Sequence, residues 1–121
     1  MKTKASHDDR MAALTFATVY PMYLAKVERK GRSKAELDAV IRWLTGLDDL
    51  ALDRLRDEKA TFATFFDVAT LNPDASLITG TICGVRVEQI TTPLTQKVRY
   101  LDKLVDELAK GWAMDRVLRR P

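Results

Sequence analysis

The sequence predicts an all-α protein, a compact orthogonal bundle of five to seven helices with one long helix near its C-terminus. Apolar residues recur every three or four positions along most of the chain, which is the period of helices buried on one face. The strong start and stop signals are helical: capping residues, prolines after them, and glycines after the apolar runs. The 121 residues suffice for one domain with a sizeable core. We predict a loose N-terminal tail over residues 1–9 and a single helical domain over residues 10–119.

The first predicted helix covers residues 18–30. Pro21 is expected in its first turn, where a missing backbone N–H costs nothing. Gly31 is expected to end the helix in the left-handed conformation. The apolar positions with helical spacing are Phe16, Val19, Tyr20, Tyr23, Leu24 and Val27.

Ser33 and Glu36 have the spacing of a capping box, which predicts a second helix that Gly46 ends after Thr45. Asp48 is the expected N-cap of a third, short helix over residues 49–58. Thr61 is the expected cap of a fourth helix. The buried positions predicted for these three helices are Leu37, Val40, Ile41, Leu44, Leu52, Leu55, Phe62, Phe65, Phe66 and Ala69.

Asn72 and Pro73 form a cap followed by proline, which predicts a further helix that presents Leu77, Ile78 and Ile82. Residues 85–90 alternate between apolar and polar residues as in a strand. Because an isolated strand has no pairing partner, we interpret this run as a turn or a single helical turn.

Thr92 and Pro93 repeat the cap-and-proline signal and predict a long helix over residues 93–110, ended by Gly111. A last short helix is expected to contain Trp112, Met114, Val117 and Leu118. The long helix carries a heptad seam of Leu94, Val98, Leu101, Val105 and Leu108. This seam is too short to argue for a free-standing coiled coil, so we expect it in the core of its own chain, with a homodimer interface as the alternative.

Three strings carry a resemblance to a known family: VYPMYLAKVERKGRSKAELDAVIRWLTG, NPDASLITGTICGVRVEQI and PLTQKVRYLDKLVDELAKG. Read in this order, over about residues 10–110, the chain resembles the bacterial family called domain of unknown function 2200. The resemblance implies a bacterial cytoplasmic protein with a mostly helical fold, and no assigned activity, cofactor or site. Ala12 stands where members often have Tyr, and Met22 where they often have His.

The net charge of +3 is concentrated toward the two ends of the chain. The densest basic run surrounds Gly31 at the junction of the first two predicted helices and consists of Lys26, Arg29, Lys30, Arg32 and Lys34. Positive charge at a helix C-terminus is explained by the helix dipole alone. The alternative is a site for an anion, a nucleic acid or an acidic protein.

Several chemistries find little support in the sequence. The single cysteine, Cys83, is expected to be a small buried residue near the end of an apolar helix, and the single histidine, His7, lies in the predicted tail. We therefore expect neither a metal nor another cofactor. Asp102 with Asp106, and Lys103 with Glu107, are typical of a solvated helix face. No apolar run is long enough for a membrane span, and we expect a cytoplasmic protein.

The leading functional prediction is a small, non-catalytic helical module for binding or protein interaction, which also forms homo-oligomers. Nucleic-acid or anion binding at the basic junction is the second prediction. The third is an enzyme with a pocket assembled from Tyr20, Tyr23, Cys83, Arg86, Arg99 and Tyr100, which requires these side chains to converge from separated segments.

Overall fold

The structure is a computed structural model that describes residues 7–120, with side chains from residue 9 onward. Among these residues the chain forms seven α-helices, two short 3₁₀ turns and one very small hairpin, which confirms the predicted all-α class. The α-helices are α1 (His7–Ala13), α2 (Phe16–Arg29), α3 (Lys34–Thr45), α4 (Asp49–Asp57), α5 (Phe62–Val68), α6 (Pro93–Ala109) and α7 (Met114–Val117). Residues 7–9 thus belong to a helix that the sequence analysis missed, and the rest of the predicted tail lies outside the described residues.

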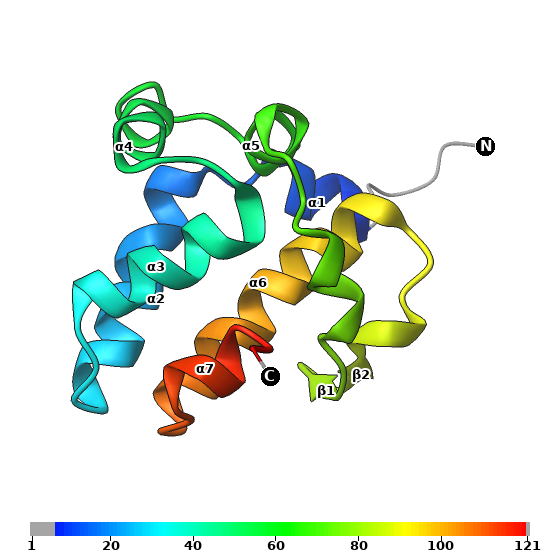
Figure 1. Ribbon diagram of the computed structural model, residues 1–121. Helices are drawn as coiled ribbons and strands as arrows, with labels where there is room; N and C mark the ends of the chain where they lie inside the picture. Colours follow the sequence, from blue (N-terminus) through cyan, green and yellow to red (C-terminus); the bar gives the residue numbers. More distant parts are fainter. Residues whose placement is uncertain (1–6, 121) are drawn as a thin grey trace.

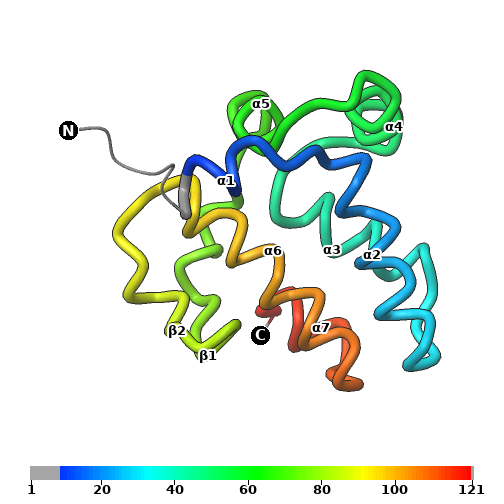
Figure 2. The backbone as a smooth tube through the Cα atoms, turned by 180° about the vertical axis from the view of Figure 1, so that it is seen from behind, coloured from blue at the N-terminus to red at the C-terminus, as the bar shows by residue number. Residues whose placement is uncertain are grey.

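Helix α6 is the axis of the molecule. It runs diagonally through both views, with α2 and α3 on one side and the hairpin on the other, while α4 and α5 lie across one end (Figures 1 and 2). It packs against α1, α2, α3, α5 and α7. Val98, Leu101, Val105 and Leu108 of the predicted seam are buried inside this chain, as the first-choice interpretation requires.

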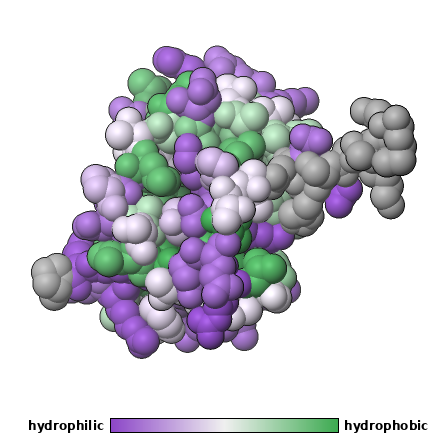
Figure 3. All heavy atoms as spheres, turned by 90° about the vertical axis from the view of Figure 1, so that its right-hand side faces the viewer, coloured by the Kyte–Doolittle hydropathy of each residue, from purple (hydrophilic) through white to green (hydrophobic). Residues whose placement is uncertain are grey.

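On one face of the molecule the apolar groups occupy small separate areas. On the face drawn in Figure 3, hydrophobic residues appear as several patches divided by hydrophilic ones. Among the residues that the structure describes, no helix has both the length and the apolar character needed to cross a bilayer.

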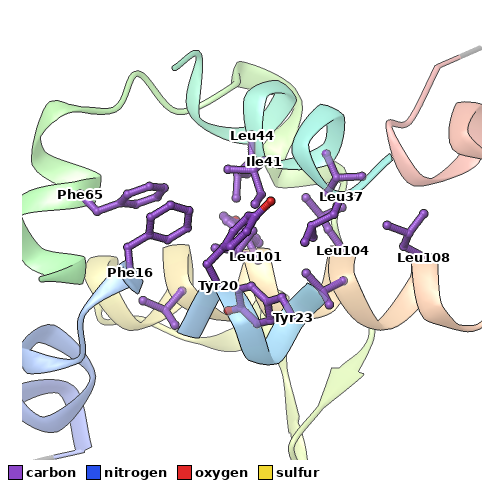
Figure 4. Packing of buried hydrophobic residues seen from close by; sticks show 14 of the residues in the cluster. Phe16, Tyr20, Tyr23, Leu37, Ile41, Leu44, Phe65, Leu101, Leu104 and Leu108 are labelled. Carbon is purple, nitrogen blue, oxygen red and sulfur yellow. The ribbon is translucent and has the colours of Figure 1, made fainter. Parts of the chain in front are cut away.

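The core is an aromatic and aliphatic layer between α2, α3, α5 and α6 (Figure 4). Phe16 of α2 stacks on Phe65 of α5 with ring centroids 4.5 Å apart, and Phe16 also meets the edge of Tyr20 at 5.5 Å. Such ring pairs add about 0.5–1.5 kcal/mol each to the free energy of burial. Leu101 and Leu104 of α6 complete the layer, and neither is exposed.

The predicted caps of α3, α4 and α5 are confirmed. Ser33 and Glu36 form both hydrogen bonds of the capping box, and the hydroxyl or carboxylate oxygens of Asp48 and Thr61 accept from the third backbone N–H of their helices. Gly46, with φ of 69°, ends α3 in the left-handed conformation.

Helix α2 begins two residues earlier than predicted, so the expected place of Pro21 in the first turn was wrong. Thr15 caps the helix by accepting from the Thr18 N–H. Backbone hydrogen bonds from Phe16 N to Ala60 O (2.9 Å) and from Phe62 N to Leu14 O (2.8 Å) fix this start against the beginning of α5. This long-range pairing places Pro21 inside the helix, at its sixth residue.

The segment between α5 and α6 differs most from the prediction. Asn72 does cap a helical segment, but it is the 3₁₀ turn Pro73–Leu77, in which Leu77 is exposed. The alternating run is divided: Val85–Arg86 is a strand, β2, which pairs antiparallel with β1 (Thr81–Ile82), so the prediction was wrong for these two residues. Val87–Gln89 is a single 3₁₀ turn, which confirms the predicted helical turn there.

The partner of this strand was overlooked because the two strands are only two residues long. Cys83 and Gly84 connect them with φ of +50° and +82°, the conformation of a tight hairpin turn. Cys83 is therefore exposed at a hairpin tip, and the prediction of a buried helical cysteine was wrong.

Candidate functional site

A pocket of about 290 Å³ opens where α1, α2, α5 and α6 meet, and we call it the α1–α6 pocket. Its walls are mostly apolar. They are formed by Met11, Leu14, Val19, Phe62 and Val98. Four polar side chains join them: Arg10, Tyr23, Arg99 and Asp102. An apolar concavity with a few convergent polar groups is the usual form of a small-molecule site.

The polar groups of this pocket form a network across two helices. The Tyr23 hydroxyl of α2 donates to Asp102 Oδ1 of α6 at 2.5 Å, and Arg99 Nη1 donates to Asp102 Oδ2 at 3.0 Å. Arg99 and Asp102 are three residues apart on α6 and so share a face. Because both oxygens of Asp102 are engaged, the carboxylate is held in one orientation at the pocket wall.

Burial is the main cause that raises the pKa of Tyr23 well above its ordinary value, and the negative charge of Asp102 adds to it. The phenol therefore keeps its proton at neutral pH and acts as a hydrogen-bond donor. A locked donor of this kind orients Asp102 but does not serve as a base or a nucleophile.

Tyr20 lies in a different place, a polar hollow of about 220 Å³ lined by residues of α2, α3 and α4. Its hydroxyl donates to Asp38 Oδ1 at 2.5 Å, and Lys34 Nζ donates to Asp38 Oδ2 at 2.7 Å. The Arg56 guanidinium covers the Tyr20 ring at 4.5 Å and is paired with Asp53 at 2.6 Å. These charges compensate one another within the protein. Burial and the neighbouring Asp38 raise the pKa of Tyr20 to about 12.

The pocket predicted from six residues is therefore divided. Tyr23 and Arg99 share the α1–α6 pocket, whereas Tyr100 is buried elsewhere in the core on α6. Cys83 and Arg86 lie exposed in the hairpin, where Arg86 pairs with Glu88 at 3.3 Å.

Asp102 is a site residue that the sequence analysis assigned to a solvated face. Its side chain is only 20% exposed, because Tyr23 and Arg99 cover it. A signal was present, since Arg99 and Asp102 have the spacing of a helical ion pair. Val19, Phe62 and Val98 of the apolar wall were predicted as apolar helix positions. Met11 and Leu14 were not, because they belong to the missed helix α1 and the residue that follows it.

Three of the five residues in the predicted basic cluster are paired within the chain. Lys26 pairs with Asp106 at 3.3 Å and Lys34 with Asp38 at 2.7 Å. Arg32 pairs with Glu36 at 2.9 Å and also donates to the carbonyl oxygen of Trp112 at 2.8 Å.

Arg32 thus ties the start of α3 to the segment that follows α6. Of the other two cluster members, Lys30 is exposed and Arg29 donates to the Ala25 carbonyl oxygen one turn earlier, at 3.4 Å. The cluster does not surround a shared pocket.

A family model described as "uncharacterized protein conserved in bacteria (DUF2200)" matches residues 10–119. The chain belongs to this family. The resemblance inferred from the three sequence strings is therefore confirmed. A solved crystal structure of an uncharacterized protein, SP1917, is similar with a TM-score of 0.86 at 42% sequence identity, over 96% of this chain and 95% of that chain. No curated protein matched the chain.

The matched range of the family contains every residue that lines the α1–α6 pocket. Neither the family nor SP1917 has a described activity, so no residue role is transferred from them. Over the part of the chain that the structure describes, no three His, Cys, Asp or Glu side chains are grouped so that they could hold a metal ion.

Proposed function

We propose that this protein is a non-catalytic binding module that holds a small, mostly apolar molecule in the α1–α6 pocket. The observation that carries the proposal is the pocket itself: a volume of about 290 Å³ with five apolar wall residues beside the Tyr23–Asp102–Arg99 network. A volume at the lower end of the range for small-ligand sites favours a compact ligand.

The state of the polar groups supports binding over catalysis. General acid–base chemistry needs a group whose pKa lies near the working pH. Tyr23 has its pKa raised far from that range, and Asp102 accepts hydrogen bonds on both oxygens. Groups held in this way fix the orientation of a ligand without exchanging protons with it.

The proposal is tested by titrating the full chain with octanoate and, separately, with 1-octanol, followed by amide NMR shifts. We expect at least one probe to shift resonances of α1, α2, α5 and α6 that surround the pocket. Val19→Phe fills the pocket and should abolish these shifts. The matched control, Val68→Phe, alters an exposed valine at the end of α5 and should leave them unchanged. Failure of both probes to bind, or unchanged binding in Val19→Phe, would contradict the proposal.

Nucleic-acid binding at the α2–α3 junction and self-association stay predictions, as does the cytoplasmic location. The prediction of nucleic-acid binding now depends mainly on Arg29 and Lys30, since Arg32 also supports the fold through Glu36 and Trp112. A test of nucleic-acid binding should therefore replace Arg29 and Lys30 and leave Arg32 intact.

A further inference from the structure

Two turns lie side by side at one end of the molecule, one between α2 and α3 and the other between α6 and α7 (Figures 1 and 2). Arg32 joins them, because its guanidinium donates to the carbonyl oxygens of Leu108 and Trp112 at 3.4 and 2.8 Å. We call residues 26–38 and 106–120, which contain both turns, the basic end. We infer that the basic end binds single-stranded nucleic acid, with phosphates at its exposed cations and a base on the guanidinium of Arg116. This inference is independent of the α1–α6 pocket and of the binding function proposed for it.

The positive charge of the described residues is concentrated at the basic end. It contains nine Lys and Arg residues against six Asp and Glu residues, a surplus of three positive charges. Residues 9–25 and 39–105, the rest of the chain with described side chains, contain nine basic and ten acidic residues. The predicted basic cluster held only five of the nine cations, because the other four follow α6 in the sequence. The fold therefore brings together two basic segments that lie far apart along the chain.

Six of the nine cations are paired with carboxylates of the basic end itself. Lys26 and Lys110 share the carboxylate of Asp106, at 3.3 and 3.0 Å. Each of the other four has a carboxylate of its own: Arg32, Lys34, Arg119 and Arg120. Ion pairing therefore joins six cations to only five carboxylates.

Three exposed cations of the basic end, Arg29, Lys30 and Arg116, have no ion-pair partner among the residues with described side chains. Arg29 donates to the uncharged Ala25 carbonyl oxygen at 3.4 Å. Within the same part of the chain Glu28 is also unpaired, and the surplus of three already includes it. The C-termini of α2 and α6 carry about half a negative charge each, so about two positive charges remain uncompensated at the surface.

Trp112 and Arg116 provide a place for a base. The guanidinium carbon of Arg116 lies over the Trp112 ring, 3.7 Å from its centroid. Trp112 is half-buried and packs against the core, whereas Arg116 is exposed. The ring therefore holds the guanidinium at the surface without neutralising its charge, and the face of the guanidinium that points away from the ring can stack on a base.

Single-stranded nucleic acid matches both features of the basic end. Its phosphates carry one charge each, and the release of their counterions favours contact with even a few exposed cations. Its bases have faces that are free to stack, whereas those of a duplex are already stacked on one another. An acidic peptide offers carboxylates for the cations but no base for Arg116.

The experiment follows the fluorescence anisotropy of labelled strands of about 12 nucleotides on addition of the full chain, at about 50 and 200 mM salt. A thymidine strand and a uridine strand both contain the phosphates and bases that the inference requires. Binding of either supports it, and the tighter of the two identifies DNA or RNA as the source. The thymidine strand should bind about tenfold more tightly than an abasic strand of the same length, which has the phosphates without the bases.

Replacing two unpaired cations tests the phosphate contacts. Arg29→Gln combined with Lys30→Gln should lower the affinity for the thymidine strand about tenfold at about 50 mM salt. The slope of log affinity against log salt should become shallower by about 1.4, since each lost phosphate contact removes about 0.7. Arg54→Gln is the matched control, because Arg54 is exposed and unpaired among the described side chains but lies on α4 at the opposite end (Figure 1). It should change neither quantity.

Arg116→Lys tests the stacked base separately, because it keeps the charge and removes the planar group. It should reduce the difference in affinity between the thymidine and abasic strands and leave the salt slope unchanged. A merely structural effect of this variant would weaken both strands equally.

Four results overturn the inference. Equal binding of the thymidine and abasic strands would remove the stacked base, and tighter binding of a duplex would remove the preference for a single strand. Equal binding of labelled polyglutamate would identify an acidic protein as the partner instead. An undiminished affinity in the Arg29 and Lys30 double variant would remove the phosphate site. None of the replaced residues lines the α1–α6 pocket, so none of these results decides the binding function proposed for it.

Discussion

Glu107 is the most deeply buried charged side chain among the described residues, with 1% of its surface exposed. It lies on α6, where the sequence predicted a solvated partner of Lys103. Instead, both of its oxygens accept from Arg119 beyond α7, through Nη1 in a short contact and through Nη2 at 2.9 Å. Lys103 donates to the Thr81 carbonyl oxygen of the hairpin. The sequence pattern was misleading because the C-terminal segment folds back over this face of α6.

Arg119→Gln should lower the free energy of unfolding by about 3–5 kcal/mol, because it leaves the buried Glu107 carboxylate without its ion-pair partner. Urea unfolding followed by circular dichroism measures the loss. The neighbouring Arg120 pairs with Asp115 at the surface, where the two side chains are 58% and 73% exposed. Arg120→Gln is therefore the matched control, with an expected change below about 1 kcal/mol. Similar losses for the two variants would contradict the assigned role of Arg119.

Helix α2 contains a proline in its interior, on an exposed face. Proline lacks the N–H that would bond to the Ala17 carbonyl oxygen, and its ring crowds the preceding turn. The helix nevertheless continues to Arg29, because Tyr20, Tyr23 and Val27 are buried against the core. Tertiary packing thus overrides a local signal for a helix start.

Pro21→Ala should raise the free energy of unfolding by about 2 kcal/mol, since the helical preference of alanine over proline outweighs the greater freedom of the unfolded chain. The same urea experiment measures the gain. Ala25 lies one turn later on the same exposed face, so Ala25→Pro is the reverse control and should cost about 3 kcal/mol or more. A loss of stability in Pro21→Ala would show that the proline ring makes contacts that offset its helical cost.

In the folded protein the pKa of each of the three tyrosines is raised above its ordinary value. Burial is the main cause at each of them. Burial together with Asp38 raises the pKa of Tyr20 to about 12, and burial together with Asp102 raises the pKa of Tyr23 well above 10.0. At Tyr100 burial alone raises the pKa. The raised pKa values concern the whole molecule, because the three tyrosines lie in different parts of one shared core.

The stability of the molecule should therefore fall as the pH rises above about 10, the ordinary pKa of tyrosine. The unfolded chain releases its phenolic protons there while the folded chain retains them, so the unfolded state binds fewer protons and the free energy of unfolding decreases with pH. Lys34, whose pKa is raised mainly by its hydrogen bond to Asp38, acts in the same direction.

Urea unfolding at several pH values between about 8 and 11 measures this slope. Tyr20→Phe removes one of the titrating groups and should make the slope shallower. Tyrosinate absorbance should stay low in the folded protein until it unfolds. A free energy of unfolding that is flat or increasing over this range would contradict the raised pKa values.

The helical class, most helix boundaries and the family were predictable from the sequence alone. These depend on local signals: the capping box at Ser33 and Glu36, the glycines that end helices, and the apolar period of α3 and α6. It also singled out Tyr23 and Arg99 as pocket candidates, although together with four residues that lie elsewhere.

Which side chains meet depends on the packing of the helices and was not predictable from the sequence. Tyr23 and Asp102 are 79 residues apart, and their hydrogen bond depends on how α2 packs on α6. The start of α2 and the burial of Glu107 likewise depend on contacts between separate segments of the chain. Helical periodicity indicates which face of a helix is apolar. It does not indicate which other helix, or which charged partner, covers that face.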